Sequence, residues 1–175
     1  ILKMNYKELF KKITTVVLDV DGVLTNGEVL LMPGMAPVRK MHSKDGYALQ
    51  LAVRNGIRVA IITGGTSTDV KERLTGLGIT DVYLGASSKM DAFEDLKMCY
   101  DLTDDEILYM GDDLPDYDVM ELAGLACAPQ DAAPEIKAIA DYVSPVLGGE
   151  GCVRDVLEQL LKIHGHWGRK EDRTW

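Results

Sequence analysis

The chain is poor in cysteine, and its three cysteines do not form a recognisable site. Cys99, Cys127 and Cys152 are odd in number, lie far apart and make no Cys-x-x-Cys pair. A secreted disulfide framework usually has an even set of cysteines, and a structural zinc site needs closely paired ligands. The sequence therefore argues against both and favours reduced thiols in a cytoplasmic protein.

Long apolar runs and an excess of positive charge are also missing. No stretch approaches the roughly 20 apolar residues of a membrane span, and the first segment, ILKMNYKELFKKI, lacks the apolar core of a signal peptide. The 19 basic residues are outnumbered by 28 acidic ones, which gives a net charge of −9. Nucleic acid and anionic membranes are therefore unfavourable main partners. An anionic substrate would need locally placed Lys or Arg side chains, or a metal ion.

What the chain does have is a series of short apolar runs that alternate with helical patterns. Its 175 residues, 46% of them hydrophobic, suit one domain with a real core. The clearest amphipathic stripe falls within residues 152–163. Such alternation predicts an α/β fold over residues 1–175, a doubly wound, Rossmann-like parallel sheet that binds ligands at the carboxyl ends of its strands. The apolar runs lie in TTVVLDVDG, IRVAIITGG, DVYLGASSK, EILYMGDD and GLACAPQDA.

Two segments depart from this rhythm. Residues 27–42 place a Pro33-Gly34 turn between two extended arms, which predicts a β-hairpin that projects from the sheet. Residues 164–175 are polar and show no periodicity, so we expect a loosely held tail.

Reactive residues follow four of the apolar runs. Because parallel strands bring their carboxyl ends to one edge of a sheet, these side chains should converge there. Buried carboxylates are costly unless a cation compensates them, and oxygen ligands suit Mg²⁺. The sequence therefore predicts a magnesium site at this edge. The residues concerned are Asp19, Asp21, Thr63, Gly64, Lys89, Asp112, Asp113 and Asp116.

Each motif alone also has an ordinary structural interpretation. The two aspartates of DVDG could form a hydrogen-bonded turn, and Thr63 could cap a helix. Lys89 could be a solvated helix residue, and GDDLPD could be a capped loop before a helix near Tyr117. The presence of all four motifs in order, each after an apolar run, favours a shared catalytic role.

This ordered set resembles the haloacid dehalogenase superfamily of aspartate-nucleophile phosphotransferases. The resemblance implies that Asp19 is the nucleophile and that Asp21 is the general acid and base. It implies that Asp19, the backbone carbonyl of Asp21, and Asp112 hold Mg²⁺. Thr63, nearby backbone N–H groups and Lys89 would bind the phosphoryl oxygens.

The same resemblance gives Asp113 and Asp116 a supporting role, in which they orient metal-bound waters or the lysine. Many relatives carry a separate cap domain of about 50 residues or more. The segments between Asp21 and Thr63 and between Thr63 and Lys89 have no room for one. The chain thus resembles the capless branch, in which a neighbouring subunit can cover the site.

Within that branch the chain is similar to the 3-deoxy-D-manno-octulosonate 8-phosphate phosphatase family. The likeness rests on the motifs already quoted, on HSKDGYALQLAVRNGI and on GGEGCVRD. It implies release of phosphate from an eight-carbon keto-sugar acid in lipopolysaccharide precursor synthesis. The substrate-binding residues that it implies are Asp21, His42, Ser43, Lys44, Asp45, Gly46, Thr63, Gly64, Arg73 and Lys89.

Three positions depart from the usual pattern of that family. Gly65 stands where the family has Arg, Lys44 stands where its loop has Arg, and Glu150 stands where its late glycine motif often has Arg or Lys. A phosphatase of a nine-carbon keto-sugar acid 9-phosphate, of the sialic acid type, is therefore an alternative. Non-enzyme alternatives are a phospho-receiver domain, whose acceptor aspartate lies elsewhere, and a catalytically silent scaffold.

The predicted hairpin also carries more apolar side chains than a free two-stranded ribbon in water can bury. We expect hairpins of several subunits to pack together in a homo-oligomer, most simply a tetramer. One subunit would then cover its neighbour's site, with Glu150 or Arg154 near the sugar. The apolar side chains are Val29, Leu30, Leu31, Met32 and Met35.

Overall fold

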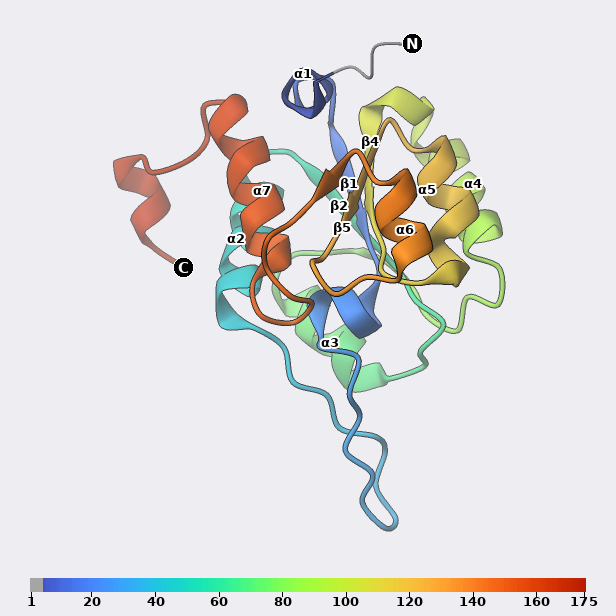
Figure 1. Ribbon diagram of the computed structural model, residues 1–175. Coiled ribbons are helices and arrows are strands. Elements are labelled where there is room, and N and C mark those ends of the chain that lie inside the picture. The colour runs from blue at the N-terminus through green and yellow to red at the C-terminus, as the bar shows by residue number, and fades with distance from the viewer. Residues whose placement is uncertain (1–4) are drawn as a thin grey trace.

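The computed structural model describes residues 5–175, so residues 1–4 of the expected domain lie outside the described part. Six parallel strands form one sheet in the order β3-β2-β1-β4-β5-β6, and helices cover both faces (Figure 1). This confirms the predicted α/β fold, and the strand order is that of a doubly wound sheet. The strands are β1 (Thr15–Leu18), β2 (Arg58–Ile62), β3 (Asp81–Tyr83), β4 (Ile107–Met110), β5 (Leu125–Ala128) and β6 (Tyr142–Val143).

The first five strands fall in the five predicted apolar runs. Along β1, Val16 and Leu18 belong to one apolar cluster and Val17 to the other, because successive side chains of a strand point to opposite faces. Burial on both faces explains why the strands are continuously apolar instead of alternating. The two-residue strand β6 was not predicted, because it is too short to give a pattern of its own.

Residues 5–175 contain seven helices and several short helical turns, which connect or flank the strands. The helices α2, α3 and α7 contribute to the apolar cluster on one face, and α4, α5 and α6 contribute to the cluster on the other. The stripe predicted within residues 152–163 is the buried face of α7. The helices are α1 (Tyr6–Phe10), α2 (Ser43–Arg54), α3 (Thr68–Gly76), α4 (Lys89–Tyr100), α5 (Tyr117–Leu122), α6 (Pro134–Ile139) and α7 (Cys152–Ile163). The short turns are Val20–Leu24, Asp104–Glu106, Leu114–Asp116 and Lys170–Arg173.

The hairpin projects from the body of the protein beyond the carboxyl ends of the strands (Figure 1). Its two arms pair through one antiparallel bridge between Leu30 and Val38, with N–H···O distances of 3.0 and 3.1 Å. The apolar side chains that the sequence places there are exposed in the isolated chain, and Leu31 retains 74% of its accessible surface. No cap domain interrupts residues 21–89, which hold only the hairpin, α2, β2, α3 and β3.

The expectation of a loosely held tail is wrong. The ring of Trp167 packs on the apolar cluster beside α2 and lies 4.4 Å from the Arg154 guanidinium. Arg169 donates a 2.7 Å hydrogen bond from Nη2 to the side-chain oxygen of Asn55 on the C-terminal cap of α2. Tyr47 donates a short hydrogen bond to the carbonyl of Asp172. Isolated contacts such as these therefore hold a segment that shows no periodic pattern.

None of the helices within residues 5–175 combines the length and hydrophobicity that a membrane crossing requires.

Candidate active site

The acidic residues of the predicted site and Lys89 gather where the two halves of the sheet meet. β1 pairs with β2 on one side and with β4 on the other. Asp19 directly follows β1, and Asp112 lies two residues beyond the end of β4. In doubly wound sheets the connections leave adjacent strands in opposite directions at this point and open a space at their carboxyl ends. The fold thus brings together residues 93 positions apart.

Lys89 lies between two buried carboxylates. Its Nζ is 2.8 Å from Asp19 Oδ2 and 2.6 Å from Asp116 Oδ1, and all three side chains are at most 9% exposed. Burial by itself lowers the pKa of Lys89, but the two carboxylates outweigh that effect and raise it. Lys89 is therefore a charged group fixed in the site, and the interpretation of a solvated helix lysine is wrong.

Asp116 positions this lysine. Besides Lys89, its Oδ1 accepts a 2.7 Å hydrogen bond from the Tyr109 hydroxyl, and its Oδ2 accepts from the backbone N–H groups of Asp112 and Asp113 at 3.1 and 3.4 Å. Both carboxylate oxygens are thus engaged, and the side chain is fully buried. Such a group fixes its neighbours in place and has little capacity left for a further ligand.

Three carboxylates form a cluster that fits a divalent cation. One oxygen each of Asp19, Asp112 and Asp116 lies within 4.8 Å of the others. Burial and the neighbouring carboxylates raise the pKa of Asp19 to about 6 and that of Asp112 to about 7. Among the described residues, no hydrogen bond or ion pair engages the side-chain oxygens of Asp112. A single lysine leaves the cluster with excess negative charge, which a hard cation would neutralise.

The backbone after β1 is shaped to admit this cluster. The Asp19 Oδ1 accepts a 2.7 Å hydrogen bond from the N–H of Val20, which fixes the carboxylate at the start of the turn. Gly22 has a φ of +93°, and a Cβ at this position would overlap the Asp112 carboxylate. Only glycine allows both the positive φ and this close approach. The hydrogen-bonded turn that was considered as an alternative therefore exists, and it coexists with the acidic cluster.

Asp21 faces the hairpin. Its Oδ1 accepts hydrogen bonds from Arg39 Nε at 2.7 Å and from the Thr25 hydroxyl at 3.2 Å, and its Oδ2 accepts from Arg39 Nη2 at 3.0 Å. Thr63 and Gly65 line the same pocket as Asp21 and Arg39. The hydroxyl of Thr63 is buried and accepts a 3.1 Å hydrogen bond from the N–H of Gly65. The cap of α3 is Ser67, so Thr63 is not the helix cap considered above.

Two predicted residues have clear local roles. Asp113 is exposed, and its Oδ1 accepts a 2.8 Å hydrogen bond from the N–H of Leu114 at the start of the turn Leu114–Asp116. The capped-loop interpretation of GDDLPD therefore holds for this residue. Gly64 lies in the loop directly after Thr63, beside the backbone of Ala86.

The segment expected to contact the sugar forms the start of α2. The Nδ1 of His42 accepts from the N–H of Lys44 and caps the helix. Ser43 and Lys44 are exposed in the first turn. A Cβ at Gly46 would come within 2.8 Å of Nη2 of Arg73, so this glycine gives the arginine room beside the helix.

Asp45 faces α7. Its Oδ1 accepts a 2.7 Å hydrogen bond from the N–H of Arg154, in the first turn of a helix whose own cap, Gly151, has no side chain to offer. Its Oδ2 is buried without a hydrogen-bond partner among residues 5–175, and burial raises the pKa of this carboxyl to about 6. Asp45 thus satisfies a free N–H at a helix N-terminus from another element.

Sequence reasoning missed Arg39 and Tyr109. Nothing in the pattern of the hairpin marks Arg39 as a partner of Asp21, since the two are 18 residues apart across an irregular segment. Tyr109 could have been found, because a tyrosine within the apolar strand ILYM needs a partner for its hydroxyl when it is buried.

Comparisons with known proteins agree with this geometry. The sequence pattern of the haloacid dehalogenase-like hydrolases matches residues 74–152. The 3-deoxy-D-manno-octulosonate 8-phosphate phosphatase KdsC of Escherichia coli K12 is 40% identical over 155 residues, which cover 89% of this chain and 82% of that protein.

Solved structures extend the likeness to three dimensions. The Yersinia pestis 3-deoxy-D-manno-octulosonate 8-phosphate phosphatase superposes with a TM-score of 0.90 at 32% identity, covering 93% of this chain and 88% of the other. The Moraxella catarrhalis enzyme of the same name, solved with magnesium, phosphate and KDO, gives 0.88 at 32% identity and covers 92% and 93%. The chain therefore belongs to the haloacid dehalogenase-like hydrolases, in the family that includes the 3-deoxy-D-manno-octulosonate 8-phosphate phosphatases.

Proposed function

We propose that this protein is a Mg²⁺-dependent phosphatase that releases phosphate from 3-deoxy-D-manno-octulosonate 8-phosphate. The observation that carries the proposal is the buried Asp19–Lys89–Asp116 arrangement beside Asp112 at the carboxyl ends of β1 and β4. It supplies a fixed cation, a carboxylate nucleophile and a cation-binding cluster within one small space. The relatives named above supply the reaction class and the substrate.

Asp19 is the nucleophile. One of its carboxylate oxygens attacks phosphorus, the bond between phosphorus and the sugar oxygen breaks, and an aspartyl phosphate forms. Asp21 gives its proton to the departing sugar oxygen and, as a carboxylate, then takes a proton from the water that attacks the aspartyl phosphate. Inorganic phosphate leaves and Asp19 is regenerated. The two groups are separated by one residue in the turn that directly follows β1.

Lys89 and Thr63 bind the phosphoryl oxygens. Lys89 donates a buried hydrogen bond to Asp116, whose Oδ1 also accepts from the Tyr109 hydroxyl, so the lysine charge needs little reorganisation as negative charge develops on the phosphoryl group. Thr63 presents its hydroxyl from the loop after β2, beside the N–H of Gly65. Asp116 acts by positioning the lysine.

Mg²⁺ fits the remaining excess of negative charge. Asp19, Asp112 and the backbone carbonyl of Asp21 would hold it, while the oxygens of Asp116 remain engaged by its own partners. When bound, the ion neutralises charge between the nucleophile and the phosphate.

The assembly, compartment and pathway follow from the same proposal. The whole chain acts as one phosphatase domain in a homo-oligomer, most simply a tetramer, in which the exposed apolar hairpin packs on other subunits. Solvent exposure of Leu30, Leu31 and Met35 supports such packing. The three cysteines are free thiols, which supports a cytoplasmic location. The product of this reaction serves lipopolysaccharide precursor synthesis.

The substrate is tested by measuring phosphate release with Mg²⁺ from the eight-carbon 8-phosphate, from a nine-carbon keto-sugar acid 9-phosphate and from neutral sugar phosphates. The nine-carbon alternative draws support from Gly65 and from Glu150, which lies 3.8 Å from Lys40 instead of offering a cation to the sugar. The proposal expects the highest kcat/KM for the eight-carbon acid. A higher value for the nine-carbon acid would favour the alternative, and no turnover of any ester would refute a phosphatase.

A further inference from the structure

Arg39 joins the hairpin to the reaction centre through a two-pronged ion pair. Its Nε and Nη2 donate to Oδ1 and Oδ2 of Asp21 at 2.7 and 3.0 Å, and the arginine side chain is only 13% exposed. Planar guanidinium and carboxylate groups match each other in this geometry, which is stronger than a single contact between exposed charges. Both oxygens of Asp21 are occupied in this arrangement. Neither can reach the oxygen of a leaving group until the ion pair opens.

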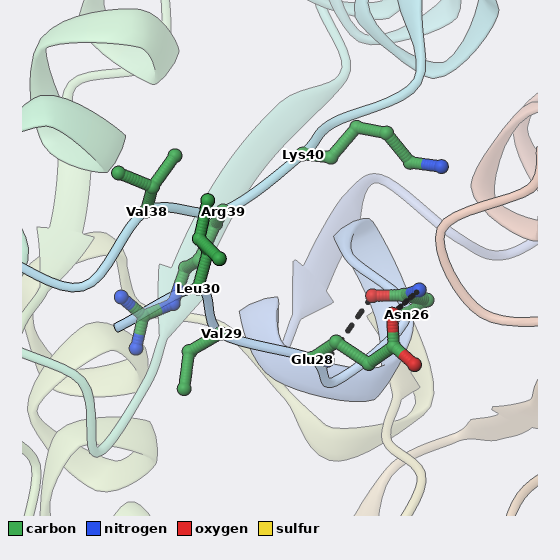
Figure 2. Close-up of a pocket in the computed structure, with 7 residues that line it drawn as sticks. All are labelled: Asn26, Glu28, Val29, Leu30, Val38, Arg39 and Lys40. Atoms are coloured by element: carbon green, nitrogen blue, oxygen red, sulfur yellow. Dashed lines mark hydrogen bonds between the residues drawn. The ribbon is translucent and has the colours of Figure 1, made fainter. Parts of the chain in front are cut away.

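Arg39 also lies at the junction of three hollows. It lines the pocket that holds Thr63 and Gly65, and it lines a groove of about 260 Å³ against α3 that includes Arg73. It further lines an open hollow of about 620 Å³ at the base of the hairpin, which Figure 2 shows. A sugar attached to a phosphoryl group near Thr63 would extend past this guanidinium.

Lys40, the next residue of the same arm, does not take part in this ion pair. Lys40 extends away from the guanidinium of Arg39 (Figure 2) and lies 3.8 Å from Glu150. The side chain of Lys40 is 76% exposed, against 13% for that of Arg39. The same arm of the hairpin therefore offers one cation to the reaction centre and one to solvent.

Position 65 leaves space for the arginine. A Cβ on Gly65 would lie 3.6 Å from Nη2 of Arg39 and 3.7 Å from Oδ2 of Asp21. Any longer side chain at this position would start beside the ion pair and extend into the same volume. Because Gly65 has no side chain, the guanidinium of Arg39 can reach Asp21 from the hairpin.

We propose that Arg39 holds Asp21 in the free enzyme and transfers its guanidinium to the carboxylate of the sugar acid when substrate binds. The substrate carboxylate replaces the Asp21 carboxylate as the partner of the guanidinium, so Asp21 becomes free to take up a proton from solvent and to donate it to the leaving oxygen. A phosphate ester of an uncharged sugar brings no carboxylate to this position, so Asp21 stays engaged. Arg39 therefore selects acidic sugar phosphates, an inference that rests on the proposed function.

The test compares Arg39→Gln, Arg39→Lys and the matched control Lys40→Gln, which removes one positive charge from the next position of the same arm. For each, kcat/KM is measured with Mg²⁺ on 3-deoxy-D-manno-octulosonate 8-phosphate and on glucose 6-phosphate, and thermal unfolding checks the fold. We expect Arg39→Gln to lower the ratio of the two values by about 10- to 100-fold, the range for a lost hydrogen bond to a charged group. Arg39→Lys should recover part of the ratio, and Lys40→Gln should change it less than about threefold.

The outcomes separate this inference from the proposed function. If wild-type protein shows no preference for the acidic substrate, the proposed function fails. If wild type prefers it but Arg39→Gln lowers both kcat/KM values equally, Arg39 only supports Asp21, and the transfer is refuted. An unchanged ratio in a folded Arg39→Gln protein also refutes it.

Discussion

Asp112→Asn should make the metal-free protein more stable while it strongly weakens the stabilisation by Mg²⁺. In the absence of metal, burial and the charges of Asp19 and Asp116 raise the pKa of Asp112 from 3.8 to about 7. An acid whose pKa is raised in the folded state lowers the free energy of unfolding as the pH rises, because the folded protein disfavours its ionised form. For Asp112 this decrease occurs between pH about 4 and 7. At pH 8 the ionised carboxylate therefore destabilises the folded state.

The size of this effect follows from the same values. The interval from 3.8 to about 7 is about 3 pH units, which at 1.36 kcal/mol per unit gives about 4 kcal/mol. Asp112 is only partly buried, and solvent screening reduces such interactions, so we expect about 2 kcal/mol. The isosteric Asn keeps the shape of the side chain and removes its charge.

The assay is urea unfolding at pH 8 and pH 5, with a chelator or with saturating Mg²⁺. In chelator at pH 8, the free energy of unfolding of Asp112→Asn should exceed that of wild type by about 2 kcal/mol. At pH 5 this difference should fall to below about 1 kcal/mol. Mg²⁺ at 100 times its dissociation constant should stabilise wild type by about 2.7 kcal/mol and the variant much less. The exposed Asp118→Asn variant on α5 is the control and should stay within about 0.5 kcal/mol. A variant less stable than wild type at pH 8, or one with equal gains at both pH values, would refute the electrostatic reasoning.

Three further predictions concern the reaction and the assembly. Asp19→Asn should fold normally but release no phosphate in a steady-state assay, because an amide cannot form the acyl phosphate; near-normal activity would exclude this nucleophile. Lys89→Met should lower the free energy of unfolding by about 3–5 kcal/mol in chelator, because it leaves Asp19 and Asp116 buried without their cation; a change below about 1 kcal/mol in urea titrations would contradict the buried ion pairs. Deletion of residues 29–38 should yield a monomer by light scattering with reduced kcat/KM on the sugar phosphate; a monomeric wild type would rule out hairpin-mediated assembly.

Much of the site was predictable because the sheet orders it. The carboxyl ends of parallel strands lie at one edge of the sheet. The residues that follow β1, β2 and β4 could therefore be placed together from sequence alone. The charge balance could be predicted as well, since two or more buried carboxylates require a cation. Lys89 was predicted from its position after the third apolar run and from the family resemblance, and it is the first residue of α4.

The contacts between irregular segments could not be predicted. The pairing of Arg39 with Asp21 depends on how the second arm of the hairpin returns to the sheet, and residues 27–42 have only one backbone bridge to fix that path. The buried role of Asp45 depends on the packing of α2 against α7, whose sequences are about a hundred residues apart. The tail is held by a few specific contacts, such as Arg169 to Asn55, and not by a periodic face.

The central claim is that Asp19 carries the phosphoryl group during turnover. The most direct measurement uses Asp21→Asn, which should slow both chemical steps by about 10²- to 10⁴-fold, the range for lost acid–base catalysis. The variant is mixed with Mg²⁺ and 3-deoxy-D-manno-octulosonate 8-phosphate, quenched in acid, digested and analysed by mass spectrometry. The account predicts a phosphorylated peptide with the modification on Asp19. Phosphate release without any phosphorylated protein, or modification of Asp112 instead, would contradict it.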